Sequence, residues 1–60
     1  MPEYRLYCLN ERGAFSKVHE IHALDDADAK AKAHGMKLGV DCELWNRDRL
    51  VAKIPAYAEA

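Results

Sequence analysis

Thr is absent from this 60-residue sequence, and Ser16 is its only Ser. No Gly-x-Ser-x-Gly element or Gly-rich phosphate loop occurs, so the usual sequence signs of a serine nucleophile and of nucleotide binding are missing. A chain this short buries only about 60% of its unfolded surface, which is too little for a large enclosed pocket. We therefore expect a protein that is not an enzyme and that needs no cofactor.

Cysteine, unbalanced charge and long apolar runs are also scarce. Two Cys are too few for a disulfide framework. The 9 Lys and Arg nearly balance the 10 Asp and Glu, which argues against a strongly basic nucleic-acid binder and against an acidic tail. No stretch approaches the roughly 18 apolar residues of a membrane span, and the N-terminus lacks the pattern of a signal peptide. We expect a soluble cytoplasmic protein with reduced thiols and no membrane partner.

Two β-strands are predicted in the first part of the chain. Residues 4–9 are rich in β-forming side chains and contain no helix breaker. Turn residues follow over 10–13, where Gly13 is free to take a positive φ. A second strand over 15–24 would form a hairpin with the first. Its apolar alternation is imperfect, which either a bulge or a strand weakly buried on both sides would explain.

A helix is predicted to start at Asp25-Asp26, because Asp caps free N–H groups and favours the positive end of the helix dipole. The segment from Ala27 to Leu38 is rich in Ala and Lys, which are good helix formers. Gly35 interrupts this segment and Gly39 ends it. Two stripes compete for the buried face, one of Ala29, Ala33 and Met36 and one of Ala27, Ala31 and Leu38. Either stripe is mostly Ala, so the helix must lie close to the surface that it covers.

A second hairpin is predicted after the helix. Strands over 41–45 and 49–54 flank a tight turn over 46–48, and Pro55 ends the pairing because it has no N–H to donate. We expect a single domain over residues 1–55 and a frayed tail over 56–60.

The element order ββαββ predicts an α+β fold. Because sequential strands tend to pair, the simplest arrangement is a four-stranded antiparallel sheet of order 2-1-3-4, with one helix packed on one face. Alternation predicts that Tyr4, Leu6, Cys8, Cys42, Leu44, Leu50, Ala52 and Ile54 face the helix. The second face has no helix to cover it, and alternation predicts that it displays Arg5, Tyr7, Leu9, Glu43, Trp45, Arg49, Val51 and Lys53.

Three segments resemble a family of small uncharacterised proteobacterial proteins of about this length. They are the opening run from Met1 to Tyr7, the Asp25-Asp26 start of an Ala-rich helix, and the run from Glu43 to Ala52. The resemblance covers nearly the whole chain and implies a ββαββ domain. It implies no activity, because these proteins look like domains of unknown function.

His19-Glu20-Ile21-His22 is the segment that most resembles a set of metal ligands. On a regular strand, residues three apart point to opposite faces, so the two imidazoles would not converge. His34 lies on the predicted helix, and the His-Glu-x-x-His zinc motif is absent. We expect no metal site at His19, His22 or His34.

The two cysteines are predicted to be neighbours. Cys8 and Cys42 fall on the same face of strands that the predicted order places side by side. A redox pair or half of a metal site is one interpretation. The other is a pair of buried core thiols, because free Cys packs as a small hydrophobe and no Cys-x-x-Cys spacing occurs. We expect core thiols that are reduced and are not required for folding.

The uncovered sheet face carries the functional prediction. Aromatic rings interleaved with basic residues on an open sheet are used by single-stranded nucleic-acid binders for stacking, although the chain is net negative and such binding depends on phosphate neutralisation. Apolar side chains on a small protein also mark contact surfaces. We therefore expect an interaction module that forms a homodimer or docks on a protein partner through this face. Single-stranded nucleic-acid binding is the alternative.

Overall fold

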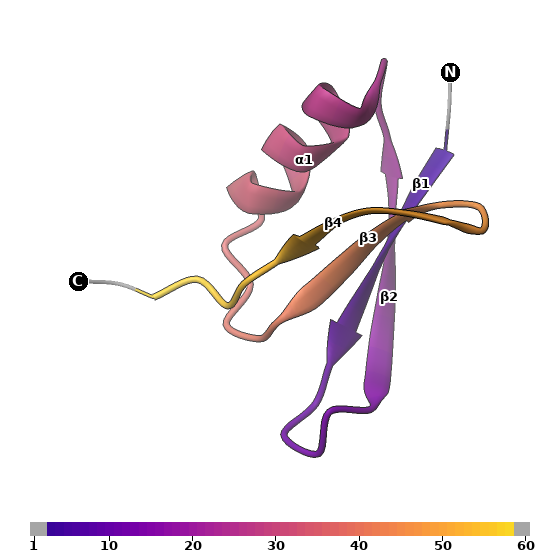
Figure 1. Ribbon diagram of the computed structural model, residues 1–60. Helices are drawn as coiled ribbons and strands as arrows, with labels where there is room; N and C mark the ends of the chain where they lie inside the picture. Colours follow the sequence, from indigo (N-terminus) through magenta and orange to yellow (C-terminus); the bar gives the residue numbers. More distant parts are fainter. Residues whose placement is uncertain (1–2, 59–60) are drawn as a thin grey trace.

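A computed structural model describes residues 3–58, which form four antiparallel strands and one helix (Figure 1). In chain order the elements are β1 (Glu3–Leu9), β2 (Phe15–His22), α1 (Asp26–Gly35), β3 (Cys42–Asn46) and β4 (Arg49–Ile54). The strands lie in the order β2-β1-β3-β4. The predicted α+β fold and its strand order are therefore confirmed.

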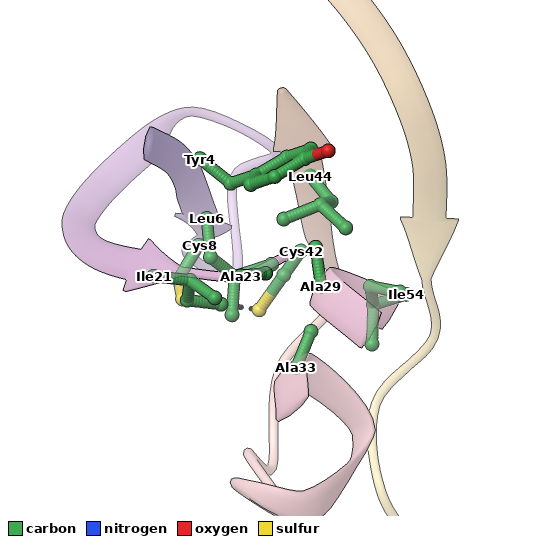
Figure 2. Packing of buried hydrophobic residues seen from close by; sticks show 10 residues of the cluster. All are labelled: Tyr4, Leu6, Cys8, Ile21, Ala23, Ala29, Ala33, Cys42, Leu44 and Ile54. Atoms are coloured by element: carbon green, nitrogen blue, oxygen red, sulfur yellow. Dashed lines mark hydrogen bonds between the residues drawn. The ribbon is translucent and has the colours of Figure 1, made fainter. Parts of the chain in front are cut away.

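The core lies between one face of the sheet and α1. Its largest fully buried side chains are Tyr4, Leu6 and Leu44, and Leu6 lies directly opposite Leu44 in the β1–β3 pairing. Burying a Leu side chain contributes about 1.5–3 kcal/mol, so this central pair carries much of the stability of a small domain. The whole cluster comprises Tyr4, Leu6, Cys8, Ile21, Ala23, Ala29, Ala33, Cys42, Leu44 and Ile54 (Figure 2).

The helix begins where the sequence predicts and ends earlier. Asp25 is the N-cap, and its Oδ1 accepts a hydrogen bond of 2.8 Å from the Asp28 N–H. The predicted end at Leu38 is wrong, because α1 stops at Gly35. Gly is a poor helix former, and Lys37 takes a left-handed φ of 52° that is typical of the residue just beyond a helix end.

The helix covers the sheet with its first alanine stripe. Ala29 and Ala33 are buried, whereas Ala27 and Ala31 of the competing stripe are exposed. With only methyl groups on its inner face, α1 lies close to the sheet, and the bulk of the core comes from the strands.

β2 ends at His22, before the predicted Leu24. Leu24 is 71% exposed, and its N–H donates to Asp28 Oδ2 at 3.0 Å, so it belongs to the start of the helix. Val18 and Ile21 lie on opposite faces of a regularly paired stretch. The imperfect alternation thus reflects a strand with apolar side chains on both faces. The register shift of this hairpin lies elsewhere, between Cys8 and Leu9.

β4 contains a bulge that changes the predicted faces. Leu44 pairs with Ala52 and Trp45 pairs with Leu50, which leaves Val51 as an extra residue without a partner on β3. Beyond a bulge of one residue the alternation of a strand is reversed. The assignments of Leu50 to the helix side and of Arg49 and Val51 to the uncovered side are therefore wrong.

The positions of these β4 residues follow from the bulge. Leu50, opposite Trp45, shares its face and is 40% exposed. Val51 packs against the core cluster. Arg49 reaches the helix side, where it forms an ion pair of 3.0 Å with Asp26.

The segment after β4 is tied to the loop between α1 and β3. The Ala56 N–H donates to Asp41 Oδ1 at 2.8 Å, and the Tyr57 N–H donates to the Leu38 carbonyl at 2.7 Å. These residues are hydrogen-bonded where the sequence predicts a frayed tail, whose last two residues lie outside the described part of the chain. Among residues 3–58, no helix has the length and apolar character needed to cross a membrane.

Candidate protein-interaction face

The sheet face opposite α1 is the candidate functional site, and we call it the open face. Residues that pair directly across the strands form two rows on this face. One row is Glu20, Arg5, Trp45 and Leu50, and the other is Val18, Tyr7, Glu43 and Lys53. Leu9 and Phe15, which pair with each other, extend the face at one end.

Six of the eight predicted face residues lie on the open face, namely Arg5, Tyr7, Leu9, Glu43, Trp45 and Lys53. Sequence analysis missed Phe15, Val18, Glu20 and Leu50. Val18 and Glu20 have the opposite parity to Ile21, but the imperfect alternation of this strand does not tell which parity faces the core, so the pairing with β1 was needed to place them. Phe15 and Leu50 lie beyond register shifts, and no local pattern gives their faces.

The apolar side chains of the open face are incompletely covered. Phe15 is 56% exposed, Val18 53% and Leu50 40%, while Tyr7, Leu9 and Trp45 are half-buried. The centroids of the Tyr7 and Phe15 rings lie 5.3 Å apart, and the rings are tilted by 47°. This distance is within the range that favourable aromatic pairs adopt. Contacts within the chain therefore bury only part of this apolar surface.

Charges of opposite sign alternate across the same face. Arg5 lies opposite Glu20, and Lys53 lies opposite Glu43. The Trp45 Nε1 donates to Glu43 Oε1 at 3.1 Å, which fixes the indole along the face. The pKa of the Arg5 guanidinium is raised, first by a hydrogen bond with Tyr7 and further by the nearby carboxylates of Glu20 and Glu3.

Arg49 belongs to a polar cluster on the helix side instead. Asp26 accepts a hydrogen bond of 2.8 Å from the Tyr4 hydroxyl and two from Arg49, of 3.0 and 3.1 Å. The hydrogen bonds from Arg49 and then Tyr4 lower the pKa of Asp26. Burial, followed by the hydrogen bond to Asp26, raises the pKa of Tyr4. This cluster ties the first turn of α1 to β1 and β4, so it stabilises the fold and adds nothing to the open face.

The two strand histidines point to opposite faces, as predicted. His19 lies opposite Leu6 on the core side, and His22 lies opposite Glu3 on the other. The donor atoms of Glu3, Glu20 and His22 lie within 4.8 Å of one another, and all three side chains are exposed. Such groups are common on protein surfaces, and Glu20 already lies beside Arg5. The absence of a metal site stays a prediction.

The prediction that the two thiols are neighbours is confirmed. Cys8 and Cys42 are both buried and lie directly opposite each other in the β1–β3 pairing. They lie on the helix side of the sheet, so they are separate from the open face.

No protein-family model, curated protein or solved structure matches this chain. The resemblance to small proteobacterial ββαββ proteins therefore stays a prediction, and the functional argument depends on the chain's own geometry.

Proposed function

We propose that this protein is a non-enzymatic interaction module that forms a homodimer through the open face. The observation that carries the proposal is the set of apolar side chains on that face, which neither α1 nor any other described segment covers. They are Tyr7, Leu9, Phe15, Val18, Trp45 and Leu50.

The small size of the chain limits the stability of the isolated domain. A core of 60 residues supplies only about 3–5 kcal/mol. The aromatic side chains of the open face are partly covered within the chain, so a contact buries only the exposed part of the roughly 150–250 Å² that each one offers, at about 25 cal/mol per Å² of apolar surface. Covering the open face with a second copy therefore adds hydrophobic free energy of the same order as the stability of the isolated domain.

The required area is available. A stable interface buries about 800 Å² on each partner, a little under a fifth of the 4416 Å² that the chain exposes. All four strands contribute to both rows of the open face, so the face spans the full width of the sheet.

Each row holds aromatic or aliphatic side chains beside charged ones, so a second copy can place a cation on an aromatic ring. In a two-fold dimer, the same surface meets itself. An axis parallel to the strands, between β1 and β3, places Arg5 of one copy over Trp45 of the other. An axis perpendicular to the strands, between the two rows, places Arg5 over Tyr7. In both cases a cation lies on an aromatic face, a favourable contact when it is desolvated.

Sedimentation equilibrium over a concentration series tests the proposal. The wild-type chain should be dimeric at high micromolar concentration, and Leu50→Glu should be monomeric because it introduces a charge into the contact. Leu24→Glu is the matched control, since Leu24 is 71% exposed and lies outside the sheet. It changes the net charge equally and should leave the dimer intact.

Two outcomes contradict the proposal. A wild-type chain that stays monomeric at high micromolar concentration excludes the homodimer. A dimer that Leu24→Glu dissociates and Leu50→Glu does not would place the contact on another surface.

Single-stranded nucleic-acid binding is the competing function. The open face carries Arg5 and Lys53 together with Glu20 and Glu43. It therefore has no excess of positive charge to neutralise phosphates. The same variants test it by their retention on immobilised oligonucleotides. Salt-sensitive retention of a monomeric wild-type chain, lost in Leu50→Glu, would replace the homodimer with this function.

A further inference from the structure

Two thiols are in contact beneath the helix. Cys8 on β1 lies directly opposite Cys42 on β3, and the Cys42 Sγ lies 3.0 Å from the Cys8 Sγ. Each side chain is only 2% exposed. Figure 2 shows both side chains among the core residues, with the Cys42 sulfur on the side of Ala23 and Cys8.

This placement satisfies the backbone requirement for a disulfide. Directly opposite residues of an antiparallel pair have Cα atoms about 4.5–5.5 Å apart, within the range of about 4.4–6.8 Å that disulfides span. Since a disulfide joins its sulfurs at about 2.05 Å, closing the bond requires them to approach by about 1 Å. We expect rotation of the two side chains to bring the sulfurs together, because the strand register already places the two residues opposite each other.

We propose that Cys8 and Cys42 form a reversible dithiol–disulfide site that exchanges with low-molecular-weight disulfides. The site is independent of the proposed homodimer, because the thiols lie on the helix side of the sheet. It differs from half a metal site in needing no further ligands.

The surroundings distinguish the two thiols. Cys8 borders a groove with a volume of about 580 Å³, whose charged lining is Arg12 and Lys17 against Glu11. Cys42 borders a smaller hollow of about 320 Å³, whose charged lining is Asp41 and Glu43 against Lys53. A disulfide that carries carboxylates, such as glutathione disulfide, fits the groove with its excess cation better than the hollow with its excess carboxylate. Cys8 is therefore the thiol that reacts first, and Cys42 is the one that resolves the intermediate.

The exchange has two balanced steps. The Cys8 thiolate attacks one sulfur of glutathione disulfide, the S–S bond of the oxidant breaks, and one glutathione leaves and takes up the proton that Cys8 lost. The Cys42 thiolate then attacks the Cys8 sulfur of the mixed disulfide and expels the second glutathione, which takes up the proton from Cys42. The pair loses two electrons and two protons, and glutathione disulfide becomes two thiols. Excess reduced glutathione reverses both steps.

The exchange should be slow at neutral pH and faster in alkali. Burial, and then the neighbouring Cys8 thiol, raise the pKa of Cys42 to about 12. Only the thiolate attacks a disulfide, so the fraction of reactive Cys42 rises about tenfold with each pH unit below that pKa. The rate of the second step should rise in the same proportion.

The test uses the full chain in native buffer with glutathione disulfide, followed by acid quenching, alkylation and mass spectrometry. The wild type should lose two hydrogen atoms in mass, remain a single chain on a non-reducing gel and recover its original mass with reduced glutathione. Cys42→Ala should stop at a mixed disulfide with one glutathione on Cys8. Cys8→Ala should react at least tenfold more slowly, because the groove thiol is gone.

Three results would overturn the site. One is a wild type that remains reduced at alkaline pH under a large excess of glutathione disulfide. Another is a product that forms only between chains. A third is equal adduct formation in the two single-Cys variants. Circular dichroism shows whether each variant folds. If one does not, the wild type is titrated with mixtures of reduced and oxidised glutathione. A single two-electron transition then supports the site, and its absence refutes it.

Discussion

Leu50→Ala and Leu44→Ala form a pair of substitutions that tests the bulge in β4. The sequence predicts both leucines in the core, whereas the structure places Leu44 at 0% exposure and turns Leu50 to the open face beside Trp45. The two changes remove the same atoms from neighbouring strands, so their difference measures the surroundings alone.

The two substitutions should lower the unfolding free energy by clearly different amounts. Leu→Ala in a closed core costs about 2–5 kcal/mol, which equals or exceeds the roughly 3–5 kcal/mol available to a domain of this size. Leu44→Ala should therefore be largely unfolded without denaturant. Leu50 is 40% exposed and leaves no enclosed cavity, so its truncation should cost about 1 kcal/mol.

Circular dichroism without denaturant shows whether Leu44→Ala is folded, and urea unfolding followed by the fluorescence of the single Trp measures the loss of stability in Leu50→Ala. The protein concentration must lie below the dimer dissociation constant, so that loss of the contact does not add to the loss of folding stability. A Leu50→Ala chain as unstable as Leu44→Ala would refute the register shift at Trp45, and with it the corrected composition of the open face.

Three further predictions concern the polar cluster, the tight turns and the thiols. The pKa of Asp26 is lowered in the folded state from its usual 3.8, so its contribution is present above that value and is lost as the pH falls through the folded pKa. The urea midpoint of Asp26→Asn should consequently fall less between pH 7 and pH 3 than that of the wild type, and equal falls would contradict this. Arg47 has a positive φ of 57° at the first position of the β3–β4 turn, so Arg47→Gly should raise the unfolding free energy by about 1 kcal/mol. Gly13→Ala, at a φ of 78°, should lower the unfolding free energy by a similar amount. An Arg47→Gly chain that melts below the wild type, or a Gly13→Ala chain that melts above it, would contradict these expectations. Finally, an oxidised Cys8–Cys42 pair closes a loop of 34 positions, which should stabilise the fold by about 4 kcal/mol in the chain-entropy model. Urea midpoints that coincide with and without reductant would contradict it.

Much of the architecture could be predicted because the relevant signals are local. Alternation in residues 4–9 identifies β1 and its two faces, Asp25 identifies the start of α1, and the element order restricts the sheet to few arrangements. From these alone the contact between Cys8 and Cys42 could be expected, since it needs only the right neighbours and the right faces.

The rest was decided by tertiary contacts. Arg49 pairs with Asp26, 23 positions away in the sequence, on the side of the sheet to which the bulge at Val51 turns it. A bulge reverses every side chain beyond it, so one inserted residue moved Leu50 onto the open face and Arg49 away from it. The order of the elements and the inward faces of β1 and β3 therefore follow from local sequence patterns, whereas the face of β2 and the composition of the candidate interface were decided only by strand pairing.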